Sequence, residues 1–541
     1  MLYTHTMPKQ VGKALVGVMA LGTFVVVLDN TIMNVSISAL VEDLGTTVSG
    51  VQAAISLNAL MMAAFVLMGG KLADILGMKK TFLLGAVLYI SGSLLASFSN
   101  NLTVFILGWC AIQGFGAAMM LPNVTTIIRA NIMGAARAQA YGMMAGINAL
   151  ATAVGPIIGG FLTTYLSWRW AFRLEVAILV FVLIMSKVIP KDSLSGIRPK
   201  LDTIGVAWQA AAMVFLVTGT LFISDYGLLM AKQPFLIGGY EFAPFGLSIV
   251  PFMFALGILC LMMFANHERK IDEQGKDKLV DLVLFKIKSF VTGLNVRFIQ
   301  VALVAGTTFA VPLFLQVTYG LDAFETGFIL LGLTAGLITT AIGGAKKGLQ
   351  FLPKQKVQWG LLISMLGLGI MIAYMVIGDE PYGLLPGLFV YGLGLGLIAS
   401  QISNLVMSAV KPKQTAEASG VASTLETLGS SVGTALVGTV LVVALTTGVA
   451  NMVQKSDVFT DDIKTEISQE MATSLEVVSS EVISDNIAEN GEFEEEAVRI
   501  YDEARQNAFI VTILFMMFSA LVAYIVAKDL PAKQIVESAE A

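Results

Sequence analysis

The sequence predicts an all-α protein that crosses a membrane many times, and its composition and hydropathy support this prediction. The chain of 541 residues is 56% hydrophobic and only 13% charged, and its mean hydropathy is +0.80. Ordinary soluble domains hold about 25% charged residues. Apolar runs of about 20 residues, which can cross the hydrocarbon core of a bilayer as helices, recur along the whole chain.

Fourteen apolar runs are long enough to cross a membrane. They lie at residues 13–37, 49–70, 81–99, 103–128, 138–165, 170–189, 204–224, 243–265, 290–317, 324–345, 357–377, 383–408, 418–450 and 506–527. The tail before the first run is short and basic, and we expect this run to be a retained span rather than a signal peptide. Most of the 33 Lys and Arg residues fall in the terminal tails and in the loops after even-numbered runs. Since basic residues concentrate on the cytoplasmic side, we expect a multi-pass plasma-membrane protein with both termini in the cytoplasm.

The first run contains an acidic residue, Asp29, deep in the stretch VVVLDNTIMNV. A charged side chain at the centre of a bilayer costs about 2.5–3.5 kcal/mol, so we expect Asp29 to face a cavity or a polar partner. A desolvated carboxyl group can exchange a proton near neutral pH. Asp29 is therefore the first candidate for binding a proton or a cation, and a purely structural hydrogen bond is the alternative.

The run at 138–165 contains Gly155, Pro156, Gly159 and Gly160 near its end. In a membrane, neighbouring helices can satisfy the backbone groups that proline and glycine leave free. We expect a bent helix with a stripe free of side chains, against which another backbone lies closely. Ordinary tight helix packing is the other interpretation of this pattern.

Further charges lie in or beside later runs. Glu175, near the start of the run at 170–189, could bind a cationic substrate or anchor the helix at the membrane interface. Arg297 and Glu426 lie in two different runs, and pairing would lower the cost of each charge. Glu426 is the second candidate, after Asp29, for binding a proton or a cation, and structural pairing with Arg297 is the alternative.

A polar segment at 451–505 separates the last two runs and holds 15 Asp and Glu residues. Apolar residues recur there at spacings of three or four, which is typical of an amphipathic helix. We expect an extracellular helical hairpin that continues from the two flanking spans. It is either an acidic, solvated cap or a gate that collects cations at the outer mouth.

Several short motifs occur together in one order along the chain. They are LDNTIMNV at 28–35, GKLADILGMKK at 70–80, IQGFGAAMMLP at 112–122, AVGPIIGG at 153–160, SWRWAF at 167–172 and KLDTIG at 200–205. Together they resemble the major facilitator superfamily, and specifically its fourteen-helix drug:proton antiporter branch. The stretches at 311–327 and 417–438 also resemble that branch.

The resemblance implies a major facilitator fold with two six-helix bundles and two additional helices. The domains would be 1–190, 191–289 with the additional helices, and 290–541 with the extracellular hairpin. It implies that Asp29 is the first-helix acid, that Gly70, Asp74, Gly77 and Lys79 belong to the gating loop, and that Gly155, Pro156, Gly159 and Gly160 form the antiporter motif. Polar residues in the spans are candidates for the substrate cavity: Asn34, Asn58, Gln113, Asn148 and Gln316.

The chain departs from the family pattern at three places. In the gating loop, Ile75 and Met78 stand where the family usually repeats basic residues, which leaves Asp74 fewer local partners. Cys110 stands where the family has an arginine that is associated with proton coupling. After the WRW motif, the family commonly has an apolar run with an asparagine, whereas this chain reads AFRLEVAI and carries Arg173 and Glu175. These departures question the coupling mechanism and leave the predicted fold unchanged.

We therefore expect a secondary active exporter that exchanges cationic or amphipathic drugs for protons by alternating access. Two alternatives remain: an exporter or facilitator of a metabolite, lipid or siderophore with altered or absent proton coupling, and a membrane assembly protein whose hairpin binds a partner. The sequence has no P-loop, HExxH or GxSxG motif, so we expect no enzyme activity. Cys110 and Cys260 lie in apolar runs, and we expect no metal site, no cofactor, no nucleic-acid partner and a monomer.

Overall fold

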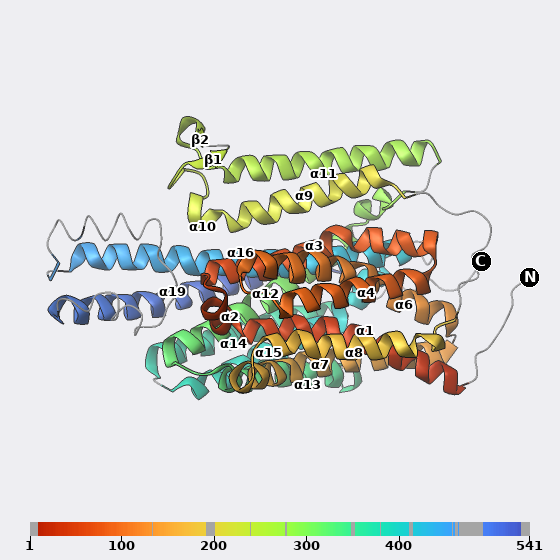
Figure 1. Ribbon diagram of the computed structural model, residues 1–541, viewed down its shortest axis with the longest axis horizontal. Helices are drawn as coiled ribbons and strands as arrows, with labels where there is room; N and C mark the ends of the chain where they lie inside the picture. Colours follow the sequence, from red (N-terminus) through yellow and green to blue (C-terminus); the bar gives the residue numbers. More distant parts are fainter. Residues whose placement is uncertain are drawn as a thin grey trace, which may run out of the picture.

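The computed structural model describes residues 9–132, 134–190, 201–237, 240–275, 278–347, 352–378, 380–410, 415–456, 458–459, 464 and 491–531. Its long helices lie roughly side by side along the long axis of the molecule (Figure 1). We call the end of the bundle at which α1, α7 and α16 finish the distal end. The first helices are α1 (Lys9–Val35), α2 (Ile37–Leu44), α3 (Val48–Leu76), α4 (Met78–Ser97), α5 (Leu102–Phe105), the π-helix η1 (Ile106–Gln113), α6 (Gly114–Asn131), α7 (Gly134–Tyr165), α8 (Arg169–Met185) and η2 (Ser186–Val188).

The middle of the chain forms a separate helix pair beside the bundle (Figure 1). Its elements are α9 (Thr203–Leu221), α10 (Ile223–Tyr226), β1 (Phe235–Ile237), β2 (Tyr240–Phe242), η3 (Pro244–Gly246), α11 (Val250–Glu273) and η4 (Leu282–Lys286). The strands β1 and β2 pair antiparallel. The Gln209 side chain of α9 donates to the Ala63 carbonyl of α3, and Thr439 of α16 donates to the Thr220 carbonyl. The helix pair therefore attaches to both halves of the bundle through α9.

The second half repeats the pattern of long helices. It comprises α12 (Lys288–Tyr319), α13 (Ala323–Lys347), α14 (Pro353–Ile377), η5 (Pro381–Gly383), α15 (Leu384–Ser408), α16 (Thr415–Lys455), α19 (Gly491–Val526) and η7 (Ala527–Asp529). Side-chain caps start several helices of the chain, as when Thr47 accepts from Gly50 N and Asp202 accepts from Gly205 N. The α16 and α19 helices project beyond the other helices at the distal end (Figure 1).

Each of the fourteen predicted apolar runs coincides with a long helix or helix segment. Among the described residues, twelve helices are long and apolar enough to cross a membrane. The α7 and α8 helices fall short of this measure, because the described apolar part of α7 is Leu150–Tyr165 and α8 has 17 residues. The multi-pass architecture is confirmed, and the predicted amphipathic helix within the hairpin lies outside the described residues.

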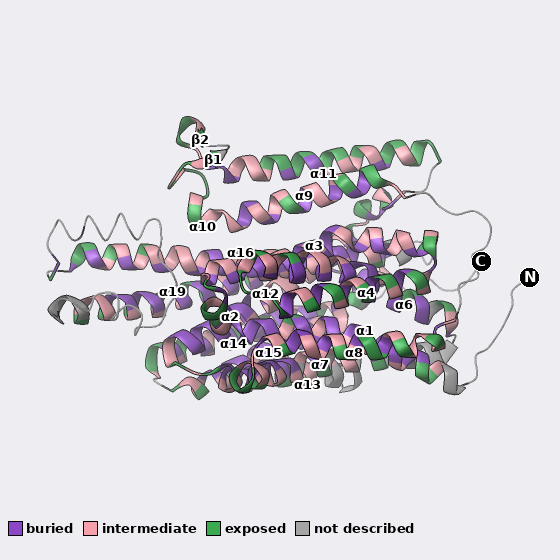
Figure 2. Cartoon of the chain, viewed as in Figure 1, coloured by how far each residue is buried: buried purple, intermediate pink, exposed green. Residues whose placement is uncertain are grey.

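The buried residues form cores within the bundle, whereas most residues of α11 are exposed or only partly buried (Figure 2). Exposed side chains on α11 include those of Leu256, Leu259 and Met262. An apolar surface of this extent is unusual on a soluble monomer and suits contact with lipid. The helix pair thus has one side against the bundle and one side suited to the bilayer.

Candidate functional site

The structure brings the two acids of the first half, Asp29 and Glu175, into one buried site. The exposed fractions are 2% for Asp29 on α1 and 0% for Glu175 on α8, and the two carboxyl groups lie within hydrogen-bonding reach of each other. Asp29 lies six residues before the end of α1, and Glu175 lies six residues after the start of α8. At 1.5 Å per residue, both acids are about 9 Å from their helix ends at the distal end. The two acids, considered separately in the sequence, form one pair.

Neutral hydrogen-bond donors surround this acid pair. The indole Nε1 of Trp109 donates to both Asp29 oxygens, at 3.1 Å and 3.0 Å. The Ser93 hydroxyl and the Gln113 side-chain amide donate to Glu175 Oε2, at 3.1 Å and 3.2 Å. The second oxygen of Glu175, Oε1, is buried and accepts no hydrogen bond from a donor in the described part of the protein.

Among the described residues, no basic side chain forms an ion pair with either acid. The Arg173 guanidinium, two residues before Glu175, instead lies over the rings of Phe98 and Trp170. Cys110, which stands where the resemblance noted in the sequence implies an arginine, is buried, and its thiol donates to the Ala54 carbonyl at 3.1 Å. Within the described part of the chain, the acid pair is therefore held by dipoles and not by a cation.

A π-helix positions the donors of the site. The η1 helix carries Trp109 and Gln113 one turn apart, and π-helical turns are frequent at functional sites. Gly92 and Gly108 let α4 and η1 approach closely, because a Cβ at Gly108 would lie 2.7 Å from Ala96 N. This close packing brings Ser93 of α4 beside Gln113 and Glu175. The Trp109 ring is fixed in turn by Phe105 and Phe172, with ring centroids 5.1 Å and 6.3 Å away.

The predicted cavity residues do not all gather at one place. Gln113 contacts Glu175, and the Asn58 side chain donates to the Trp109 carbonyl at 3.0 Å, so both belong to the surroundings of the acid pair. The Asn34 amide donates within α1 to the Asn30 carbonyl, and the buried Asn148 Oδ1 accepts no hydrogen bond from a donor in the described part of the chain. Gln316 of α12 donates to the Val35 carbonyl of α1 at 2.8 Å, so it joins the two halves.

The second-half acid Glu426 lies apart from the acid pair and contacts Arg297. Arg297 Nε donates to Glu426 Oε1 at 2.8 Å, and Arg297 also donates to Gln300 at 2.8 Å. The exposed fractions of the two charged side chains are 19% and 35%. The geometry matches the structural pairing that the sequence left open as an alternative.

We expect a charge exchange to test this ion pair. Arg297→Glu and Glu426→Arg should each lower the thermal midpoint of the detergent-solubilised protein, because each leaves two like charges together. The double variant should recover stability, with a coupling free energy of about 1 kcal/mol for a partly exposed pair. If the thermal midpoint of the double variant is no higher than that of the less stable single variant, the two residues do not form a structural pair.

The α7 residues that the sequence predicts to form the antiporter motif contact helices of both halves. Gly155 and Gly159 face α1: a Cβ at Gly155 would overlap Thr31, and one at Gly159 would lie 2.9 Å from the Ile32 Cα. Gly160 faces the Ala323 carbonyl of α13 so closely that a Cβ would overlap it. The α7 stripe free of side chains, predicted from the sequence, therefore packs against two other helices.

A seam of contacts joins the two halves near the distal end. It contains the close approach of Gly327 on α13 to the Pro156 carbonyl on α7. Two hydrogen bonds cross it between α3 and α16: Gln52 donates to the Ala435 carbonyl at 3.0 Å, and Ser431 donates to the Ser56 carbonyl at 2.6 Å. A third joins α13 to α7, where Phe324 N donates to Thr164 Oγ1 at 3.3 Å. The Gln316 to Val35 hydrogen bond adds α1 and α12 to this seam. The two halves are thus tightly packed toward the distal end.

The predicted gating loop forms the turn between α3 and α4. Gly77 has a φ of 100°, a conformation that favours glycine. Lys79 donates to the Ile189 carbonyl at 2.6 Å and ties the turn to the chain that follows α8. Asp74 is exposed, and a Cβ at Gly70 would meet open space. Because α3 begins near the distal end and runs the length of the bundle, the turn at its other end lies opposite the seam (Figure 1).

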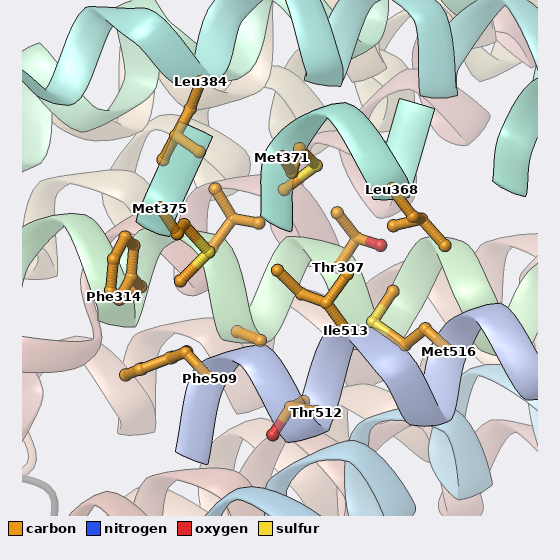
Figure 3. A pocket seen from close by; sticks show the side chains of 12 residues that line it. Thr307, Phe314, Leu368, Met371, Met375, Leu384, Phe509, Thr512, Ile513 and Met516 are labelled. Carbon is orange, nitrogen blue, oxygen red and sulfur yellow. The ribbon is translucent and has the colours of Figure 1, made fainter. Parts of the chain in front are cut away.

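The described residues also line a small cavity in the second half, between α12, α14, α15 and α19 (Figure 3). Its lining is mainly apolar and includes Phe314, Met371, Met375 and Met516. A volume of about 10 Å³ is close to the minimum for one water molecule, whereas pockets for drug-sized ligands measure about 300–1,000 Å³. This cavity is too small for a drug in the conformation described.

Sequence reasoning missed Trp109, Ser93 and Gly327. A tryptophan within an apolar run was a usable signal, because its N–H needs an acceptor in a medium without water. Ser93 carried no such signal, since a serine in a membrane helix commonly bonds to its own backbone. Gly327 lies in the stretch at 311–327 that resembles the family, but the sequence does not identify its neighbour.

Comparison with known proteins agrees with this architecture. A family model described as Major Facilitator Superfamily matches residues 19–434. The "Probable actinorhodin transporter" of Streptomyces coelicolor is 28% identical over 422 residues, which are 76% of this chain and 69% of that protein. "Multidrug resistance protein 3" of Bacillus subtilis is 26% identical over 424 residues, 78% of each chain. "Multidrug efflux pump LfrA" of Mycolicibacterium smegmatis is 24% identical over 428 residues, 78% of this chain and 79% of that protein.

Solved structures share the fold at low sequence identity. A bacterial homolog of the human lysosomal transporter Spinster, in an inward-facing and unoccupied conformation, gives a TM-score of 0.61 at 12% identity and covers 98% of this chain and 100% of that chain. An auto-inhibited POT family peptide transporter gives 0.60 at 14% identity and covers 98% of this chain and 99% of that chain. At these identities the likeness concerns the fold.

Proposed function

This chain belongs to the major facilitator superfamily, and we propose that it is a secondary active exporter of cationic or amphipathic drugs in exchange for protons. The superfamily consists of transporters and not of enzymes. The three relatives named above, at 24–28% identity, carry names that describe transport, drug resistance or drug efflux. A transporter that moves a substrate uphill without ATP needs a second, downhill ion.

The buried acid pair is the observation that supports proton exchange most directly. Asp29 and Glu175 lie together without a basic partner in the described part of the protein, and two adjacent carboxylates cannot both stay charged in a desolvated site. The site must therefore hold at least one proton. Proton binding at this place in α1 and α8 would affect both helices, and α1 contacts the antiporter stripe of α7 through Thr31.

We propose that all fourteen apolar helices cross the membrane, α7 and α8 included. Two six-helix bundles, in residues 1–190 and 290–541, would move against each other, and residues 191–289 would add the α9 and α11 pair. The distribution of basic residues supports a distal end that faces outward in the plasma membrane and termini in the cytoplasm. The gating loop with Lys79 would then lie on the cytoplasmic side.

The seam supports alternating access as the mechanism. With the distal end outward, the seam closes the protein toward the outside, and the substrate site would open toward the cytoplasm. Asp29 is 2% exposed in this conformation, so a substrate does not reach it here. Opening of the seam would separate α7 from α13, and release of the proton from the acid pair would accompany the change between the two states.

Uptake by inverted membrane vesicles tests the proposed function. Vesicles that contain the full chain, with an imposed pH gradient that is acidic inside, should accumulate an ethidium-like cation. Addition of a protonophore should abolish this accumulation, because the proton gradient is its only energy source. Vesicles without the protein are the control. Accumulation that persists after the gradient has collapsed would contradict proton exchange.

A further inference from the structure

We infer that the pair of Asp29 and Glu175 carries one proton in this conformation and that this proton is bound to Glu175. Trp109 is then a positioning residue, which keeps Asp29 as the acid that binds and releases the transported proton. This inference rests on the proposed function and deepens it. It assigns different tasks to the two acids and predicts exchange of one proton in each cycle.

The hydrogen bonds distinguish the two acids. Both Asp29 oxygens accept from the one N–H of Trp109, an arrangement that requires acceptors and suits a carboxylate. Glu175 Oε2 accepts from Ser93 and Gln113, but no donor among the described side chains and backbone groups is directed at the buried Glu175 Oε1. The Asp29 carboxyl lies within reach of Glu175. A proton on Oε1 would satisfy this atom by donation to Asp29, whereas a proton on Asp29 would compete with Trp109.

The other groups around the pair do not change this assignment. The titratable side chains that face it from neighbouring helices are Tyr89 of α4 and Cys110 of η1, both buried and both neutral in the ordinary state. The donors Trp109, Ser93 and Gln113 are also neutral. A doubly charged pair would therefore have no cation among the described side chains to offset it, and the pair would alternate between one proton and two. The second proton would bind to Asp29 and leave from it, while Glu175 would stay protonated.

Two substitutions of Glu175, one that keeps its hydrogen bonds and one that removes them, should have opposite effects. Glu175→Gln keeps a donor toward Asp29 and an acceptor toward Ser93 and Gln113, so it imitates the protonated acid. It should still drive accumulation of an ethidium probe from a pH gradient with the same ratio of protons to substrate, at a lower rate. Glu175→Ala removes the donor and should uncouple transport. A Glu175→Gln variant that cannot use the gradient would overturn the assignment.

Trp109→Phe tests the positioning role, because it retains a ring against Phe105 and Phe172 but removes the N–H. Loss of a hydrogen bond to a charged acceptor destabilises the Asp29 carboxylate, so its proton should leave only at higher pH. The pH of half-maximal exchange should rise by about one to two units. Trp168→Phe is the matched control: Trp168 is equally buried, lies beside Phe105, and donates to Asp43 at 2.8 Å instead of to the pair. An unchanged pH profile for Trp109→Phe would overturn the positioning role.

Infrared spectroscopy of the purified full-length protein locates the proton without any transport assay. The carbonyl stretch of a protonated carboxyl group at neutral pH should disappear in Glu175→Gln and persist in Asp29→Asn. The reverse result would overturn the assignment to Glu175, even if the chain proves to be a proton-coupled exporter. If vesicles that contain the wild-type protein do not accumulate the probe in response to a pH gradient, the proposed function is contradicted instead. The two failures are therefore distinguishable.

Discussion

Replacement of Asp29 by asparagine should abolish drug accumulation driven by a pH gradient. Asparagine has nearly the same shape and can still accept from the Trp109 indole, but it cannot bind or release a proton near neutral pH. Exchange of one proton allows up to about a hundredfold accumulation across two pH units, because each unit corresponds to a factor of ten. We therefore expect the accumulation ratio of Asp29→Asn to fall from this range to about one.

Passive exchange provides the control for this variant. Asp29→Asn should still equilibrate labelled substrate across proteoliposomes without a gradient, since the seam and the helix packing stay the same. Its thermal midpoint should equal or exceed that of the wild type, because the variant removes an ionisable group from a buried site. Gradient-driven accumulation at the wild-type level in Asp29→Asn would remove this residue from the coupling mechanism.

Gly160→Val and Gly327→Val should each prevent closure of the seam and stop transport. Added side chains at these positions would overlap the Ala323 and Pro156 carbonyls, which belong to helix backbone and cannot move aside as a flexible side chain can. Small residues at helix crossings in membranes permit such backbone contacts. The state described here should therefore lose most of its population in both variants.

Distances between spin labels on α7 and α13 near the distal end provide the measurement. They should lengthen in Gly160→Val and Gly327→Val relative to the wild type, and drug export should fall to the level of vesicles without the protein. Both native cysteines, Cys110 and Cys260, are buried, which favours selective labelling of introduced cysteines. Gly17→Ala on α1 is the control, because its Cβ would meet no atom within 4 Å. Wild-type distances and export in both valine variants would refute the role of the seam.

Local features of the sequence predicted much of this protein correctly. The fourteen apolar runs coincide with helices, because a chain without access to water must satisfy its backbone groups internally. The glycine stripe of α7 was predicted to accept another backbone, and Gly160 does so against α13. Asp29 and Glu175 were selected as candidates because a charge in an apolar run is costly and needs a reason.

The sequence by itself therefore determined which segments are helices and which polar side chains need partners, since both follow from hydropathy and the cost of burying polar groups. Only the tertiary structure determined which residues are those partners. Asp29 and Glu175 belong to helices far apart in the chain, and they meet because α1 and α8 pack against each other, while the close packing of α4 and η1 at Gly92 and Gly108 places their donors. Likewise, the seam joins residues separated by more than 100 positions, as in Gln52 and Ala435. Contacts of this kind depend on the relative placement of whole helices, which no local pattern specifies.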